Sequence, residues 1–178
     1  DVITTRCTNN YGPRQFVEKL IPKTIGLCRQ DRNIPVYGTG KSVRDWIHVE
    51  DHCDAILAVL EKGKSGESYN ISSANEVDNL TIVKKILKIL DKSEDKVQFG
   101  EERPGADLRY SLDSTKILTE LGWSPKISLD EGLKNTIDWY LSHDDDWWNN
   151  IPEVTYSATP WKNNYENSLK KMGYKIND

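Results

Sequence analysis

The sequence of 178 residues is 37% hydrophobic and 29% charged, and its formal net charge is −4, values that are ordinary for a globular protein with one core. The negative balance excludes a broad basic surface for nucleic acid, so an anionic ligand would need individually placed Lys and Arg side chains. No stretch approaches the roughly 18 apolar residues of a membrane span. We therefore expect neither a nucleic-acid nor a membrane partner.

The chain opens with a strand and a helix. β-branched residues over 2–7 predict the strand, which ends at the turn signal of residues 9–13. Because this strand is already under way at the first residue and no initiator Met precedes it, we expect the chain to be part of a longer protein. Apolar residues three and four apart then predict a helix over 16–29, in which Pro22 is expected either to introduce a kink or to start the main part. Residues 36–40 indicate a short strand and a hairpin turn.

Residues 43–49 predict the next strand, and an acidic pair after it opens a helix that ends at Gly63. We expect this helix to bury its apolar positions, which are Cys53, Ile56, Leu57, Val59 and Leu60. A strand at 68–72 and a helix at 80–92, capped by Asn79, follow.

Two further helices complete the pattern. Asp113 caps a short helix that stops at Gly122. Ser128 and Glu131 have the spacing of a capping box, which opens a longer helix. Beyond His143 the apolar periodicity ends. The alternation of strands and helices predicts an α/β fold.

The three cysteines are widely separated and lie among apolar residues: Cys7, Cys28 and Cys53. This pattern favours buried thiols in a reducing compartment over a disulfide framework. We therefore expect a cytoplasmic protein.

Three local patterns suggest ligand sites but fail on their context. Residues 40–42 resemble the end of a phosphate-binding P-loop, yet Pro35 stands where that motif requires glycine and a strand follows instead of a helix. His48 and His52 are expected on different elements, so we predict no metal site. Tryptophans near the end are expected to pack within the protein and not to stack on bases; they are Trp139, Trp147, Trp148 and Trp161.

Ten short motifs occur in a fixed order along nearly the whole chain. They cover residues 5–15, 18–22, 35–40, 44–46, 48–52, 69–71, 103–110, 121–123, 136–140 and 159–162. The first six resemble the extended short-chain dehydrogenase/reductase superfamily. The last four narrow the resemblance to the dTDP-glucose 4,6-dehydratases.

This resemblance implies a Rossmann-type parallel sheet joined to a small mixed α/β substrate-binding domain. Residues 1–178 would form the carboxyl-terminal, nucleotide-sugar-binding portion, holding the last strands and a helix of that sheet. Segments 1–10 and 43–63 are expected to belong to the sheet, whose amino-terminal half would lie outside the chain.

The resemblance also implies roles for individual residues. Asn9 is similar to a sugar contact, and Asn10 to a contact of the NAD cofactor. The other residues expected to bind the dTDP-glucose substrate are Lys19, Leu20, Pro35, Tyr37, Arg44, Asn70 and Arg103. The cations among them would hold the diphosphate, and Pro35 and Tyr37 would flank the thymine. Ala106 stands where the family commonly has His.

In the family, NAD oxidises C4 of the glucose, an acid pair removes water across C5 and C6, and the hydride returns to C6. The implied product is dTDP-4-keto-6-deoxyglucose, and the complete enzyme is expected to be a homodimer. We expect this chain to lack the glycine-rich dinucleotide fingerprint, the catalytic Tyr-x-x-x-Lys and the Asp-Glu pair that precedes it, so we assign it no catalytic residue. The alternatives are another NAD-dependent nucleotide-sugar epimerase or decarboxylase, and a sugar-nucleotide-binding module without catalysis.

Overall fold

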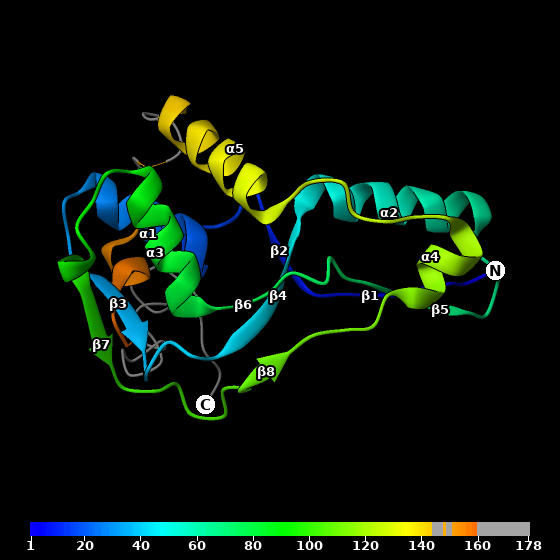
Figure 1. The fold of residues 1–178 in the computed structure, drawn as a ribbon, viewed down its shortest axis with the longest axis horizontal. Coiled ribbons are helices and arrows are strands. Elements are labelled where there is room, and N and C mark those ends of the chain that lie inside the picture. Colours follow the sequence, from blue (N-terminus) through cyan, green and yellow to red (C-terminus); the bar gives the residue numbers. More distant parts are fainter. Residues whose placement is uncertain (144–147, 149–150, 160–178) are drawn as a thin grey trace, which may run out of the picture.

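The computed structural model describes residues 1–143, 148 and 151–159. Within them the chain forms an α/β fold of two lobes joined by one long strand (Figure 1), as predicted. The tail expected after His143, with Trp147 and Trp161, lies outside the described residues. Among those that are described, no helix is long and apolar enough to cross a membrane.

The strands are β1 (Thr4–Cys7), β2 (Asn9–Tyr11), β3 (Ile34–Tyr37), β4 (Val43–His48), β5 (Ser68–Ile71), β6 (Glu76–Asp78), β7 (Val97–Gly100) and β8 (Arg109–Tyr110). The helices are α1 (Leu20–Arg29), α2 (Val49–Lys62), α3 (Asn79–Ile89), α4 (Thr115–Leu121) and α5 (Leu129–Ser142), with the short 3-10 helices η1 (Glu94–Lys96) and η2 (Glu153–Tyr156). The predicted turn at 9–13 therefore begins later than expected, because β2 occupies its first residues.

Strand β4 joins the two lobes. It pairs in parallel with β2 and β8 and antiparallel with β6. A separate parallel pair lies in each lobe, β1 with β5 and β3 with β7, and Figure 1 shows β4 crossing between them. Strand pairing in these three sheets is thus mostly parallel, as is usual in α/β folds.

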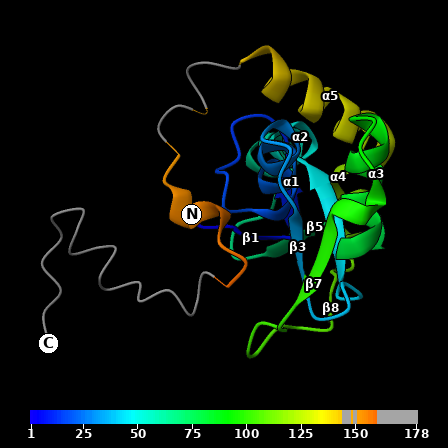
Figure 2. The ribbon, with the colours of Figure 1, turned by 90° about the vertical axis from the view of Figure 1, so that its left-hand side faces the viewer.

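The prediction of a hairpin after β3 is wrong, because β3 does not pair with the strand that follows it. β3 pairs with β7 (Figure 2), and the turn that leaves β3 is fixed to a helix instead. Gly38 and Gly40 adopt left-handed φ angles of 53° and 70°, which glycine reaches without steric cost. The carbonyl of Gly40 then accepts a 3.0 Å hydrogen bond from the N–H of Leu80 at the start of α3. The turn therefore leads to the amino end of α3.

Alternate residues of β4 face different lobes, as the pleat of a strand requires. Trp46 packs with Tyr11 in a core cluster that includes side chains of α1 and α5. Ile47 packs with residues of α2, β5 and α4. A third cluster, between α1, α3 and β3, completes the core. Adjacent side chains of β4 are thus buried in different core clusters.

The carboxylate of Asp45 is fully buried at the centre of β4. It accepts hydrogen bonds from the hydroxyls of Ser72, at 2.5 Å, and Ser73, at 2.7 Å. It also accepts one from the backbone N–H of Ala74 at 3.3 Å. The loop that follows β5 is therefore attached to the strand that joins the lobes.

Helix ends follow the expected rules with two corrections. The residue that directly precedes α4 is Ser114 and not Asp113, although the Asp113 carboxylate accepts from the N–H of Thr115 at 2.8 Å. Ser128 caps α5 by accepting from the N–H of Glu131, and Gly122 ends α4 in the left-handed conformation. The cap of α3 is Asp78 and not Asn79, because the Asp78 carboxylate accepts from the N–H of Thr81 at 2.9 Å. The residue predicted as the cap is the first residue of the helix.

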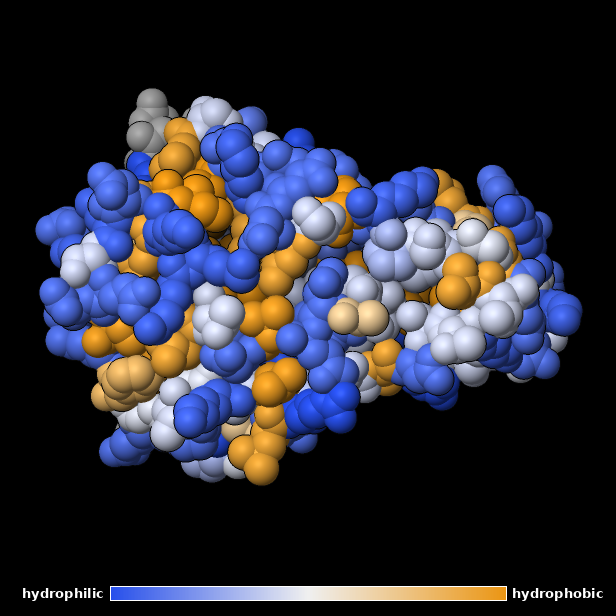
Figure 3. Space-filling model, in the orientation of Figure 1, coloured by the Kyte–Doolittle hydropathy of each residue, from blue (hydrophilic) through white to orange (hydrophobic). Residues whose placement is uncertain are grey.

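The apolar face expected for α2 is only partly correct. Val59 is buried, as predicted, but Leu57 and Leu60 are 56% and 74% exposed, and Cys53 is exposed as well. Among the other thiols Cys28 is buried and Cys7 half-buried. The spacing of apolar residues predicts which face of a helix can be buried. How many of those residues are buried depends on the elements that pack against the helix. In the described residues, β5 and α4 cover one side only, and apolar atoms reach the surface on the lobe that holds α2 (Figure 3).

Strand β1 is exposed on both faces. Thr4, Thr5 and Arg6 are all exposed, and in the described chain β1 pairs only with β5. Parallel strands of α/β proteins are normally covered on both faces. That segments 1–10 and 43–63 belong to a larger Rossmann-type sheet stays a prediction, with which this exposure is consistent.

Residues 1–178 by themselves are expected to associate, because β1 offers unpaired backbone groups and α2 offers exposed leucines. The double variant Leu57→Glu/Leu60→Glu should raise the monomer fraction in size-exclusion chromatography. Val59→Glu, on the buried side of the same helix, should instead abolish the thermal unfolding transition. A single monomer peak and a two-state melt for the unmodified chain would contradict this expectation.

Asp45→Ala is expected to lower the free energy of unfolding by about 2–4 kcal/mol, because the buried hydroxyl of Ser72 and the two partly buried donors of Ser73 and Ala74 lose their common acceptor. Urea unfolding measures the change, and Asp107→Ala, at an exposed position, serves as the control with little effect. An unchanged free energy for Asp45→Ala would mean that the hydroxyls find other acceptors.

Candidate functional site

Asn9 and Arg44 lie on the same face of the β2–β4 pair. Asn9 stands opposite Trp46 in the parallel register, and Arg44 precedes Trp46 by two residues on β4. Residues two apart on a strand point to the same side. The structure therefore brings these two predicted site residues to one surface, both of them half-buried.

Arg44 is placed beside the amino end of α3. It stands opposite Val77 of β6, and two residues later α3 begins at Asn79. The N–H of Asn79 donates to the carbonyl of Ser42 at 3.2 Å. The guanidinium of Arg44 donates to the carbonyl of Val43 at 2.7 Å, and no ion pair with a carboxylate is found for it among the described residues. Its charge is thus available to an anion.

Tyr37 and Arg103 lie close together at one end of the β3–β7 pair, and Pro35 stands two residues before Tyr37 on β3, opposite Gln98. Tyr37 is the last residue of β3 and stands opposite Gly100, the last of β7, and Arg103 follows three residues later. Burial raises the pKa of the Tyr37 phenol, and the nearby Arg103 charge opposes that rise. The phenol is therefore neutral at physiological pH, and a cation lies close to it.

Lys19 and Leu20 form the amino end of α1. Lys19 is the residue before the helix, is exposed, and pairs with Glu18 at 2.6 Å. The helix has no side-chain cap and no acidic residue in its first turn, so its backbone N–H groups face no negative side chain of that turn. Leu20 is half-buried and packs between two core clusters. Its role in packing is clear from these contacts.

Asn10 points away from Asn9, because adjacent residues of a strand face opposite sides. Its amide nitrogen donates to the Thr8 carbonyl at 3.1 Å and to the Cys7 sulfur at 3.2 Å. Its amide oxygen is buried and has no partner in the described part of the chain. A buried acceptor of this kind would normally be satisfied by some group. Asn10 thus has an acceptor to offer a ligand on that side.

Asn70 is not brought together with the other predicted residues. It lies on β5 opposite Arg6, and its side chain donates to the carbonyl of Asp113 at 3.0 Å. A contact from Asn70 to the same ligand stays a prediction. Sequence reasoning instead missed Asn79, which it treated only as a helix cap. The pairing of β6 with β4, which no local pattern indicates, places Asn79 near Arg44.

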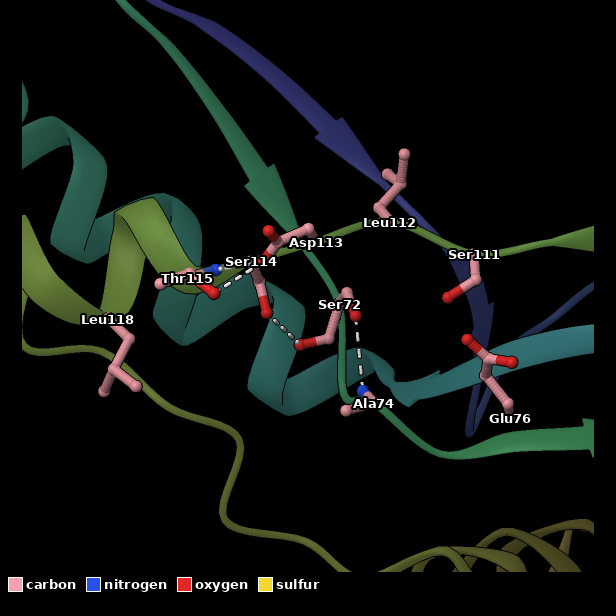
Figure 4. Close-up of a pocket in the computed structure, with 9 residues that line it drawn as sticks. All are labelled: Ser72, Ala74, Glu76, Ser111, Leu112, Asp113, Ser114, Thr115 and Leu118. Carbon is pink, nitrogen blue, oxygen red and sulfur yellow. Dashed lines mark hydrogen bonds between the residues drawn. The ribbon is translucent and has the colours of Figure 1, made fainter.

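A pocket of about 430 Å³ lies elsewhere. It is lined by Ser72, Ala74, Glu76, Ser111, Leu112, Asp113, Ser114, Thr115 and Leu118 (Figure 4). None of the predicted site residues lines it, and neither does a lysine or arginine. Because a diphosphate needs cationic donors, we favour the surface positions of Arg44 and Arg103 as the candidate site.

One literal Tyr-x-x-x-Lys occurs in the chain, from Tyr37 to Lys41. In a helix, a spacing of four places two side chains on one face, one turn apart. Here the intervening Gly38 and Gly40 have left-handed φ angles, and the segment is a turn. It therefore lacks the geometry of a helical Tyr–Lys pair, and no catalytic residue is assigned to it.

His48 has a structural role. Its Nδ1 accepts from the N–H of Glu50 at 3.4 Å, which caps α2, and its ring packs edge-on against Tyr11. In the part of the chain that the structure describes, no group of three or more His, Cys, Asp or Glu side chains could hold a metal ion.

Comparison with known proteins places these observations in a family. A family model described as GDP-mannose 4,6 dehydratase matches residues 1–136. A dTDP-glucose 4,6-dehydratase of Streptomyces niveus is 48% identical over 148 residues, covering 83% of this chain and 44% of that protein. A dTDP-glucose 4,6-dehydratase of Escherichia coli is 42% identical over 167 residues, covering 88% and 46%.

Comparison with solved structures gives matches to the same kind of enzyme. The chain aligns with DesIV, a dTDP-glucose 4,6-dehydratase from Streptomyces venezuelae with NAD and TYD bound, at a TM-score of 0.80 and 42% identity, covering 84% of this chain and 46% of that one. A UDP-glucose 4-epimerase from Thermotoga maritima with UDP-glucose gives 0.75 and 30%, covering 79% and 46%. The chain thus spans somewhat less than half the length of these relatives.

Proposed function

The chain belongs to the family described as GDP-mannose 4,6 dehydratase, and on that premise we propose that it is the nucleotide-sugar-binding part of an NAD-dependent dTDP-glucose 4,6-dehydratase. Family membership confirms the resemblance that the motifs predicted. Identities of 42% and 48% to dTDP-glucose 4,6-dehydratases, against 30% to the epimerase, support the choice of reaction.

The observation that carries the proposal is a pair of arginines without carboxylate partners, one of which lies beside the amino end of α3. Arg44 lies beside the start of α3, and Arg103 lies beside Tyr37. Neither forms an ion pair among the described residues, whereas many other cations of the chain do. Guanidinium groups and helix amino ends both suit phosphate. Together they would hold the diphosphate of a nucleotide sugar.

The remaining residues would position the ends of that ligand. Pro35 and Tyr37 offer a flat, half-buried wall for the base. Lys19 would add a point charge to the diphosphate, and Asn9 would donate to and accept from the sugar hydroxyls. In this proposal Asn79 joins the diphosphate site, and Asn70 contacts the ligand from the other lobe.

The fit to NAD rests on Asn10. Its buried, unpartnered amide oxygen could accept a hydrogen bond from the carboxamide of the nicotinamide. When bound, NAD would supply the hydride acceptor and donor that an elimination through a 4-keto sugar requires. Asn9 and Asn10 face opposite sides of β2, so in the proposal substrate and cofactor would meet this strand from its two faces.

The proposal extends to the whole protein as a cytoplasmic homodimer that makes dTDP-4-keto-6-deoxyglucose. The free thiols of Cys7, Cys28 and Cys53 are consistent with a reducing compartment. A nucleotide-sugar epimerase is the second candidate, and the 0.75 TM-score to the epimerase supports it at the level of fold. Nucleotide preference and product distinguish the two.

Binding to the full-length protein tests the proposal. Titration calorimetry should show tighter binding of dTDP than of UDP or GDP. Arg103→Ala and Arg44→Ala should each weaken dTDP binding by about 1.5–3 kcal/mol, the range for hydrogen bonds to charged groups, while NAD affinity stays unchanged. Lys88→Ala, at an exposed position near the far end of α3, is the control. Preference for UDP would favour the epimerase, and equal loss of dTDP and NAD binding would show that the arginines are misplaced.

Residues 1–178 alone, mixed with dTDP-glucose and NAD, should form no 4-keto-6-deoxy product, because the chain has no assigned catalytic residue. Product formation can be followed by mass spectrometry, with the full-length protein as the positive control. Turnover above the blank, in a preparation shown by mass to contain only these residues, would contradict the assignment.

A further inference from the structure

Trp148 and residues 151–159, which we call the strap, pack across α1. The strap carries the short helix η2, which lies beside α1 (Figure 1). Tyr156 of the strap is only 5% exposed and joins the core cluster between α1, α3 and β3. The strap is thus docked on the helix whose amino end carries Lys19.

Gly26 lets the strap pack closely against α1, because it has no side chain. A Cβ atom at this position would lie 2.8 Å from the Trp148 ring and 3.1 Å from the Tyr156 ring. Glycine in a helix interior costs about 0.5–1 kcal/mol relative to alanine, so its presence here coincides with a close approach of two aromatic rings. Any larger residue would push the strap away.

Two arginines, one on α1 and one in the turn that follows it, contact side chains of the strap. The Arg29 guanidinium lies 4.8 Å from the centre of the Trp148 ring, and the Arg32 guanidinium 5.4 Å from that of Tyr156. Arg32 also pairs with Glu153 of the strap at 2.7 Å. Both arginines therefore connect to the strap as well as to their own segment.

Lys23 holds the strap from within. It is only 6% exposed, and its ammonium donates to the carbonyl of Ser157 at 2.6 Å. Its backbone N–H donates to the carbonyl of Lys19 at 2.9 Å. One turn of helix therefore connects the strap contact to the candidate diphosphate residues.

We propose that the strap positions the amino end of α1 for nucleotide binding, with Gly26 and Lys23 as the positioning residues through which it acts. The inference rests on the proposed function, because it assigns the strap to the diphosphate site. α1 has ten residues, and isolated helices of that length are unstable in water. Its geometry therefore depends on what packs against it, and the strap covers one of its sides.

Gly26→Ala separates strap docking from helix stability. The change favours the helix, so any loss of function cannot come from a weaker α1, while the new methyl group blocks the two rings. In the full-length protein we expect the strap amides of residues 155 and 157 to exchange faster with deuterium. The Kd for dTDP should rise roughly fivefold to tenfold, and KM should rise in parallel while kcat stays unchanged.

The pH dependence of docking tests Lys23. Burial and the Arg32 charge lower the pKa of Lys23 to about 8, while Glu18 raises it. An undocked strap would leave Lys23 in water with its ordinary, higher pKa, so the undocked state binds more protons between these two values. Docking should therefore strengthen as pH rises above about 8. Glu153 remains paired with Arg32 in this range, and burial raises the pKa of the Tyr156 phenol so that it stays neutral.

Exchange of the strap amides, corrected for intrinsic rates, should slow from pH 7 to pH 9 in the unmodified protein and lose this dependence in Lys23→Met. Lys88→Met, at an exposed lysine, should keep it. Unchanged strap exchange and dTDP affinity in Gly26→Ala would overturn the proposal. Faster strap exchange with unchanged dTDP affinity would refute the positioning role. An unmodified protein that binds no dTDP would refute the proposed function and the positioning role with it, while the exchange data would still decide whether the strap is docked as described.

Discussion

The buried carboxylate of Asp45 is the interaction on which the arrangement of the two lobes depends. A carboxylate without water must have its hydrogen bonds supplied by the protein, and the loop after β5 supplies them through two hydroxyls and one N–H. That loop leads directly into β6, which pairs with β4. The amino end of α3 is therefore placed beside Arg44 as a consequence of how one buried charge is satisfied.

The pleat of β2 and β4 divides the candidate site between two faces. Asn9 and Arg44 lie on one face with Trp46, while Asn10 and Asp45 lie on the other with Ile47. Adjacent residues of a short motif can thus have unrelated tasks, one in ligand binding and one in holding the fold. This explains how a run such as Arg44-Asp45-Trp46 can carry a proposed binding residue, a structural anchor and a core residue in succession.

Several groups lack hydrogen-bonding or packing partners among the described residues. The amide oxygen of Asn10 is buried without a partner, Leu57 and Leu60 are exposed, and β1 is open on both faces. These features lie in the lobe that holds α2 and at β2, whereas the cationic surface lies toward the other lobe. The proposed division of labour, with substrate on one side and cofactor on the other, accords with this distribution.

The sequence by itself determined the α/β class, the positions of the long helices, the capping by Ser128 and the family, because these depend on propensities and side-chain spacings within a few residues. Only the tertiary structure decided that β3 pairs with β7, that Asp78 and not Asn79 caps α3, and that α2 buries Val59 but exposes Leu60. It also decided that Arg44 meets the start of α3 while Asn70 lies apart. Pairing between distant strands is chosen by which side chains can be buried together, and that choice involves residues too far apart in the chain for any local pattern to record.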